Sequence, residues 1–128
     1  MADRLFDTTV FIDYFRGDAT VREHVEPVIE GRRSASFSVI TEAELWVSLR
    51  NQRETDQCAA LLSLMERATM DGDIAREAGA MRRRHQQRGV TLPDAIIAAT
   101  AKLRGEPILT KNRRHLEPFA SEVKVETY

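Results

Sequence analysis

The sequence has a single cysteine, almost no net charge and no long apolar run, and each of these shortages excludes a class of protein. Cys58 has no partner for an internal disulfide, and the apolar helical residues around it predict a buried thiol rather than a reactive one. No stretch approaches the roughly 18 consecutive apolar residues that a membrane span requires. The charged Asp3 and Arg4, with no apolar run after them, argue against a secretory signal, so we expect a protein of the cytoplasm.

The charges are nearly balanced, because 19 basic residues stand against 20 acidic ones and the net charge is −1. A general electrostatic attraction to nucleic acid is therefore not indicated. Basic residues do cluster at 82–85, with Arg88 close by, and at 111–115, where they could contact phosphates locally. For the three arginines at 82–84 we favour the simpler interpretation of a solvated helix face.

The spacing of apolar residues predicts short strands that alternate with longer helices in one domain over residues 1–128. Strands are predicted at 5–6, 35–39, 68–70, 107–109 and 123–125. Helices are predicted at 10–15, 18–29, 41–49, 56–65, 74–87 and 91–104, and the last of these is apolar on more than one side. Such an alternation is typical of an α/β fold, in which helices cover both faces of a parallel sheet.

The stretch 4–15 places one carboxylate, Asp7, between a short apolar strand and a helix. In an open α/β sheet, ligands bind in the crevice outside the carboxyl ends of the strands, so an acid at this junction has a functional position. The alternative is that Asp7 only caps the helix that follows, because aspartate is a common N-cap residue. Both interpretations stay open on this stretch alone.

Two further acids, Glu44 and Asp94, stand three residues after Thr41 and Thr91, each in the first turn of a predicted helix. A capping box, in which the acid complements the helix N-terminus, would explain each of them. Parallel strands bring their carboxyl ends to one edge, however, so these acids can also converge with Asp7 there. Clustered carboxylates repel one another unless a cation neutralises them, and oxygen ligands suit Mg²⁺ or Mn²⁺.

Four segments of the chain carry a family resemblance: LFDTTVFIDYF, SVITEAELW, LPDAIIAATA and ILTKNRRHLEPF. In this order and at these separations they resemble the motifs of the PIN-domain ribonucleases and, more narrowly, of the toxin subunit of VapBC toxin–antitoxin pairs. The resemblance implies a three-layer α/β/α sandwich on a short parallel sheet and an endoribonuclease that depends on Mg²⁺, with Mn²⁺ able to substitute. It also implies an RNA substrate, a VapB-like antitoxin that blocks the site, and a homodimer without attachment to a membrane.

The resemblance further implies which acids form the site. The family's three acids fall on Asp7, Glu44 and Asp94. Asp7 and Asp94 would hold the metal, and Glu44 would either join them or act through water. The three would then be the catalytic residues of the chain.

Polar residues with a supporting role are implied in the same way, at Thr8, Thr110 and Asn112, where a hydroxyl or amide would orient a carboxylate or the substrate. Many members place a fourth acid three residues after that asparagine, where this chain has His115. We expect His115 to lie outside the direct metal ligands, because nearby carboxylates favour the imidazolium, which cannot ligate. The number of metals is therefore left open.

Two alternatives to a nuclease remain. In a haloacid-dehalogenase-like phosphotransferase, Asp7 would be the nucleophile and Lys111 would steady the phosphate, but the second acid expected two residues on is here Thr9. A degenerate PIN domain would keep the fold and only bind RNA or a partner.

Candidate docking residues for an antitoxin are three aromatic side chains that could equally belong to the core: Phe11, Phe15 and Trp46.

Overall fold

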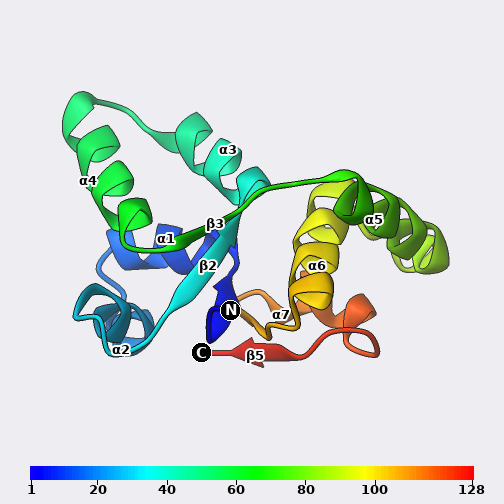
Figure 1. Cartoon of the computed structure of the whole chain (residues 1–128). Helices are drawn as coiled ribbons and strands as arrows, with labels where there is room; N and C mark the ends of the chain where they lie inside the picture. The colour runs from blue at the N-terminus through cyan, green and yellow to red at the C-terminus, as the bar shows by residue number, and fades with distance from the viewer.

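Five short parallel strands form one sheet in the middle of the molecule, between two groups of helices (Figure 1). The computed structural model describes residues 1–128. The strands follow the order β3-β2-β1-β4-β5 across the sheet, and their bounds are β1 (Arg4–Phe6), β2 (Ala35–Ser38), β3 (Glu66–Ala68), β4 (Ile108–Thr110) and β5 (Val125–Thr127). In the central strand, Leu5 pairs with Ser36 on one side and with Ile108 on the other. The predicted parallel sheet is confirmed.

Seven α-helices and two short 3₁₀ helices connect the strands. They are α1 (Thr8–Phe15), α2 (Ala19–Ile29), α3 (Val39–Ser48), α4 (Gln52–Ser63), α5 (Gly72–Arg84), η1 (Gln86–Arg88), α6 (Leu92–Arg104), α7 (Arg113–Leu116) and η2 (Glu117–Phe119). Helices α1, α2 and α4 lie on one side of the sheet, and α5, α6 and α7 lie on the other (Figure 1). This arrangement is the predicted α/β/α sandwich.

Each face of the sheet has its own apolar core. On the side of α1, α2 and α4, the ring of Phe11 packs edge to face against Phe6 and Phe37, with centroids 6.0 and 6.3 Å away. On the other side, every residue of α6 from 95 to 101 is buried. The all-round apolar sequence of this helix predicts such burial, because only a helix covered on several sides can bury so wide a stripe.

The start of α3 differs from the prediction. The helix begins directly after Ser38, because the hydroxyl of Ser38 accepts a 3.2 Å hydrogen bond from the backbone N–H of Ile40. Thr41, the predicted cap, lies inside the helix, and its buried hydroxyl is 3.0 Å from that of Thr8. The predicted capping box at this helix is therefore wrong, and Glu44 lies in the second turn of α3 rather than in the first.

Several other predicted boundaries move by a few residues. Helix α4 begins at Gln52, because Asn51 caps it by accepting the backbone N–H of Glu54 at 2.9 Å. Helix α5 covers residues 72–84 instead of 74–87. Strands β3 and β5 lie at 66–68 and 125–127, two residues from the predicted positions, because pairing with β2 and β4 fixes their register.

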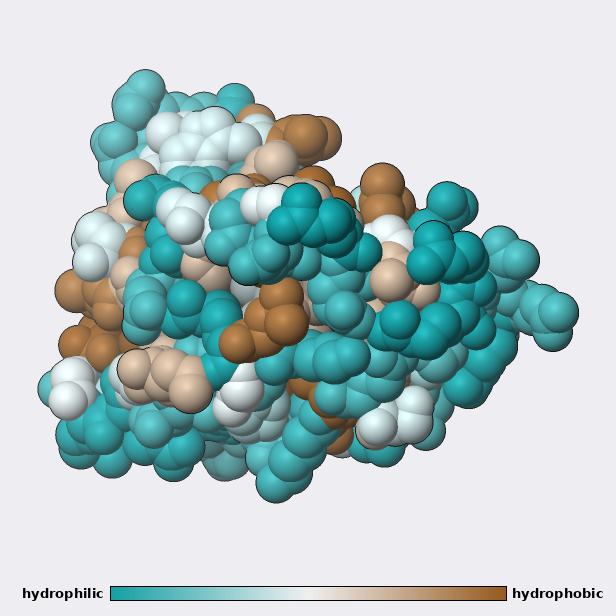
Figure 2. All heavy atoms as spheres, turned by 45° about the vertical axis from the view of Figure 1, so that its right-hand side comes forward, coloured by the Kyte–Doolittle hydropathy of each residue, from teal (hydrophilic) through white to brown (hydrophobic).

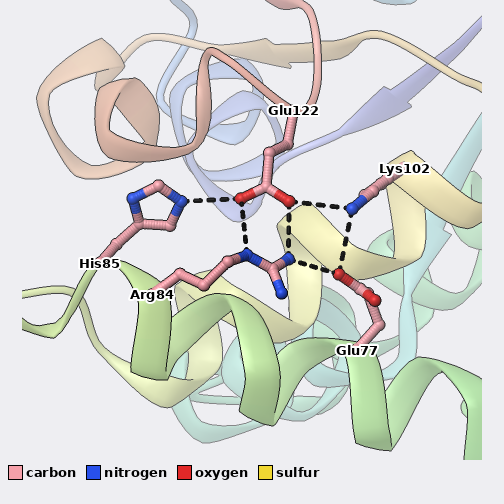
Figure 3. Close-up of polar contacts among 5 residues, drawn as sticks. All are labelled: Glu77, Arg84, His85, Lys102 and Glu122. Atoms are coloured by element: carbon pink, nitrogen blue, oxygen red, sulfur yellow. Dashed lines mark hydrogen bonds and ion pairs between the residues drawn. The ribbon is translucent and has the colours of Figure 1, made fainter.

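An ionic network joins α5 and α6 to the turn before β5 (Figure 3). Glu122 accepts hydrogen bonds from Arg84 (2.6 Å), Lys102 (2.8 Å) and His85 (2.7 Å). Arg84 and Lys102 also reach Glu77, at 2.6 and 3.0 Å. Burial alone would raise the pKa of Glu122, but the three donors outweigh it and lower that pKa to about 2. Arg84 is thus an ion-paired residue and not part of a freely solvated arginine face.

The surface over α5 and α6 is mainly polar. Figure 2 turns this side toward the viewer and shows a largely hydrophilic face on which apolar side chains appear only in small, separate areas.

Cys58 is buried, as predicted, so its thiol is not a surface nucleophile. None of the helices combines the length and the apolar character that a membrane span would require.

Candidate active site

Asp7 occupies the junction between β1, the central strand, and α1. Its backbone has the extended conformation of an N-cap residue, but its side chain makes no capping hydrogen bond. Instead, Oδ2 accepts hydrogen bonds from the hydroxyls of Thr9 (3.0 Å) and Thr110 (2.8 Å). The other oxygen, Oδ1, makes no hydrogen bond and is accessible to solvent. Capping therefore does not explain this carboxylate, which is held at one oxygen and available at the other.

Asp94 is the third residue of α6, where Thr91 is the cap. The hydroxyl of Thr91 accepts the backbone N–H of Asp94 at 3.2 Å, as the sequence predicts. The Asp94 side chain is 20% exposed. Burial raises its pKa, and the negative charge of Asp7 raises it further, although Thr91 and His115 act in the opposite direction. The carboxylate of Asp7 is thus near enough to contribute to the raised pKa of Asp94.

Glu44 lies on the other side of Asp7, on α3. Its Oε1 accepts a 2.8 Å hydrogen bond from the hydroxyl of Thr8, the first residue of α1. Thr8 is buried, whereas Glu44 is an exposed residue. Glu44 is therefore tied to the start of α1, beside the Asp7 junction.

The turn after β4 forms another wall of the site. Thr110 donates to Asp7 and accepts the backbone N–H of Asn112 at 3.0 Å, and Thr9 accepts the backbone N–H of Lys111 at 3.2 Å. The carboxamide of Asn112 makes no hydrogen bond and does not cap α7. Thr9 is the site residue that the sequence did not reveal. A threonine near the start of a helix is common, and only the contact with the turn after β4 distinguishes Thr9 from such a residue.

His115 lies beside Asp94, with its Nδ1 3.5 Å from Oδ2 of the carboxylate. Its side chain is 57% exposed, so this residue is on the surface at the rim of the site. The neighbour of Asp94 at this rim is therefore an imidazole and not a further carboxylate.

The donor set can be compared with the needs of a metal ion. No three His, Cys, Asp or Glu side chains are close enough to hold an ion together. Mg²⁺ does not require such a cage, because it is usually held by one or two carboxylates while water and substrate phosphate complete its coordination. Asp7 and Asp94 are two neighbouring carboxylates, and an oxygen of Asp7 is free. The residues therefore fit Mg²⁺ or Mn²⁺ bound through two carboxylates better than an ion enclosed by protein.

Comparisons with known proteins identify the family of this chain. The model of the PIN domain family matches residues 4–119. Ribonuclease VapC19 of Mycobacterium tuberculosis is 30% identical over 118 residues, which cover 91% of this chain and 94% of the relative. A toxin–antitoxin complex from Klebsiella pneumoniae contains a similar chain with 30% identity, a TM-score of 0.79 and coverage of 97% and 96%. VapBC2 from Rickettsia felis, bound to a DNA fragment from its promoter, has a TM-score of 0.81 at 16% identity, with both chains covered to 98%, and supports the fold. This chain therefore belongs to the PIN-domain family and, within it, to the VapC-type toxins.

Proposed function

We propose that this chain is a metal-dependent endoribonuclease that acts as the toxin of a toxin–antitoxin pair. The observation that carries the proposal is the Asp7 carboxylate at the end of the central strand, which Thr9 and Thr110 hold at Oδ2 while Oδ1 makes no hydrogen bond, with Asp94 as a second carboxylate near it. Such a pair is unfavourable by itself and becomes favourable once a divalent cation neutralises it. Mg²⁺ is the ion we expect, and Mn²⁺ should substitute for it.

The residues around the pair would have defined tasks in phosphodiester hydrolysis. Thr9 and Thr110 hold Oδ2 of Asp7 and leave Oδ1 to face the ion. Glu44, fixed by the Thr8 hydroxyl, would orient water beside the other carboxylates. A divalent ion at this position would lower the pKa of a water and neutralise charge in the transition state, so no protein nucleophile is required.

The alternatives from the sequence have less support. A haloacid-dehalogenase-like enzyme needs an acid two residues after its nucleophile, and here that residue is Thr9, whose hydroxyl is bonded to Asp7. A degenerate domain that only binds RNA would give no chemical role to Asp94. The ionised form of that side chain is disfavoured by burial. A hydrolase that uses a metal accounts for both carboxylates.

An antitoxin is the protein partner in this proposal. A cavity of about 350 Å³ between α1, α3 and α4 is lined by equal numbers of hydrophobic and other residues, and the hydrophobic ones include Phe15, Leu45 and Leu49. Phe15 and Trp46 are each 42% exposed and remain candidate docking residues, but Phe11 is only 1% exposed, so its docking role is wrong. A VapB-like chain could fill this cavity and place an arginine among the acids, where a guanidinium would replace the charge of the metal.

A homodimer, which the family resemblance favours, and a location in the cytoplasm complete the proposal. Sedimentation of the purified chain, alone and with its antitoxin, gives the oligomeric state. A structure of the complex in which no partner side chain enters the acidic cleft would contradict the arginine mechanism.

The central experiment is cleavage of labelled RNA by the purified chain with Mg²⁺, with Mn²⁺ and with EDTA. We expect internal cuts that require the ion and that disappear in Asp7→Asn. A generic phosphatase substrate in the same buffers tests the phosphotransferase. Turnover of that substrate, or inactive protein that is correctly folded by circular dichroism, would refute the endoribonuclease.

A further inference from the structure

A polar pocket lies beside the proposed metal site, and of its lining residues only Thr9 has a role in the chemistry described above. Its volume is about 340 Å³, within the range of roughly 300–1,000 Å³ typical of small-molecule sites. It lies between α1 and the turn after β4, and its lining is Thr9, Ile12, Asp13, Arg16, Lys111 and Asn112. Neither Glu44 nor Asp94 takes part, so the pocket extends the site to one side of Asp7.

Two hydrogen-bonded paths connect this pocket to Asp7. The hydroxyl of Thr9, in the pocket wall, donates directly to Oδ2 of Asp7 at 3.0 Å. The backbone N–H of Asn112 donates to Thr110, which in turn donates to the same oxygen. A group in the pocket would therefore lie next to the group bound at Asp7. The two groups can be neighbouring parts of one molecule.

The charges in the pocket single out Arg16. Lys111 lies 3.9 Å from Asp13 and 3.6 Å from Asp18, so nearby acids offset its charge. Asp13 is also occupied, because it accepts a 2.7 Å hydrogen bond from Tyr128. Arg16 is an exposed residue at the end of α1, and its guanidinium has no salt bridge and no hydrogen bond. It is the one cation in the pocket without a partner.

Asn112 is the second uncommitted group. Its backbone N–H is used by Thr110, but its carboxamide is free and lines the pocket. An amide offers both donors and an acceptor, which suits the edge of a nucleobase or a ribose hydroxyl. A free guanidinium, in contrast, suits a phosphate. The two groups together match the two halves of one nucleotide.

From this arrangement we infer that the pocket binds the nucleotide next to the scissile phosphate, with Arg16 on its phosphate and Asn112 on its base or sugar. The inference rests on the proposed function and adds a substrate subsite to it. Arg16 is a binding residue here, because it lies outside the hydrogen bonds around Asp7. The inference also predicts an order of importance, in which Arg16 matters more than Lys111, since only Lys111 has carboxylates within 4.0 Å of its charged group.

The test measures binding separately from cleavage. A fluorescein-labelled single-stranded oligoribonucleotide of mixed sequence is titrated with the full chain in EDTA, and anisotropy is recorded at several salt concentrations. Arg16→Ala should raise Kd roughly three- to tenfold and reduce the slope of log K against log salt by about 0.7, the value for one phosphate contact on a single strand. Asn112→Ala should raise Kd without changing that slope, because an amide carries no charge.

Two charge-matched variants serve as controls. Arg83→Ala removes an exposed cation of α5 that, like Arg16, has no salt bridge and no hydrogen bond, but lies on the other side of the sheet, and it should leave Kd and the slope unchanged. Lys111→Ala should have a smaller effect than Arg16→Ala. In Mg²⁺, Arg16→Ala should raise KM and leave kcat within about twofold, since the lost contact is made equally in the ground state and the transition state.

The outcomes separate this inference from the proposed function. Metal-dependent cleavage by the wild type, with an Arg16→Ala variant that binds RNA like the wild type, would overturn the pocket and leave the nuclease intact. An equal loss in Arg16→Ala and Arg83→Ala would also overturn it, because the effect would then come from the total charge of the protein and not from the pocket. No cleavage by the folded wild type would refute the nuclease itself, whatever the binding curves show.

Discussion

The hydroxyl of Thr110 donates a 2.8 Å hydrogen bond to Oδ2 of Asp7, although 103 positions separate the two residues in the sequence. Thr110 ends β4 and Asp7 follows β1, and these strands are neighbours in the sheet. Thr110 is fully buried, and its oxygen accepts the N–H of Asn112, which fixes the direction of its own O–H. The bond therefore orients Asp7 and joins it to the turn after β4.

Thr110→Val keeps the shape of this side chain and removes the donor. We expect RNA cleavage to fall about 10- to 100-fold, as for other partners of metal-binding carboxylates. The free energy of unfolding in urea should fall by about 1–3 kcal/mol, because a buried carboxylate oxygen loses a hydrogen bond. Thr110→Ser keeps the donor and should cleave RNA like the wild type, although the loss of a buried methyl group should lower its stability by about 1 kcal/mol.

Thr100→Val is the matched control for Thr110→Val. Thr100 is equally buried, but its hydroxyl donates to the carbonyl of Ile96 within α6 at 2.7 Å. Its loss should lower stability by about 1 kcal/mol and leave cleavage unchanged. Full activity in Thr110→Val would show that this hydroxyl does not position Asp7.

Asp94→Asn should abolish cleavage and yet stabilise the metal-free protein. Burial raises the pKa of Asp94 and the charge of Asp7 adds to it, so the ionised group destabilises the fold at neutral pH. The Tm advantage of the variant should therefore be largest above the raised pKa and shrink as the pH falls toward the ordinary value of 3.8. Added Mg²⁺ should raise the Tm of the wild type only.

A purely structural Asp94 would give the opposite result. If it served only as part of the α6 cap, the substitution would cost about 0.5–2 kcal/mol and spare catalysis.

Asp7→Asn should also abolish cleavage with the fold intact, because the amide keeps the hydrogen-bonding shape and loses the charge. Wild-type activity in either variant would refute the site.

The sequence was most informative where one local signal had no competitor. Helix α6 combines a threonine cap at Thr91, an unbroken apolar stripe and a left-handed Gly105 at its end, so its bounds and burial could be predicted. The start of α3 could not be predicted from the sequence, because Ser38 and Thr41 are both plausible N-cap residues. The contact of Thr41 with Thr8, which no local pattern reveals, decides between them.

The same distinction applies to the site. The junctions that carry Asp7 and Asp94 follow from the strand and helix pattern, and parallel topology explains why they meet. The connection of Thr9 to Lys111, and the pocket that contains Arg16, exist only because the turn after β4 packs on α1. Contacts between segments a hundred residues apart have no period or motif in the sequence, so these features required the structure.

Glu122→Gln tests the network between α5, α6 and β5. The variant keeps the size of the side chain and removes its charge, so the unfolding free energy should fall by about 1–3 kcal/mol while RNA cleavage stays unchanged. The pKa of Glu122 is lowered to about 2, so its contribution is present above its ordinary pKa of 4.5 and is lost as the pH falls toward 2. The stability difference between the two proteins should shrink over that range.

Glu26→Gln is the control for this charge removal. Its pair with Arg22 spans 3.7 Å between side chains that are about half exposed, so the loss should stay below about 0.5 kcal/mol. An equally small effect of Glu122→Gln would mean that the network of Figure 3 does not stabilise the fold.

The contact of His115 with Asp94 gives the last prediction. The ring lies 3.5 Å from that carboxylate and is 57% exposed, so His115→Asp would place a third acid within reach of the metal. Because Mg²⁺ and Mn²⁺ prefer oxygen, the new carboxylate should tighten Mn²⁺ binding or add a second binding event in calorimetry. His115→Ala should leave the first event unchanged, since Asp7 and Asp94 remain. Loss of that event in His115→Ala would show that the imidazole is itself a ligand and that two carboxylates do not suffice.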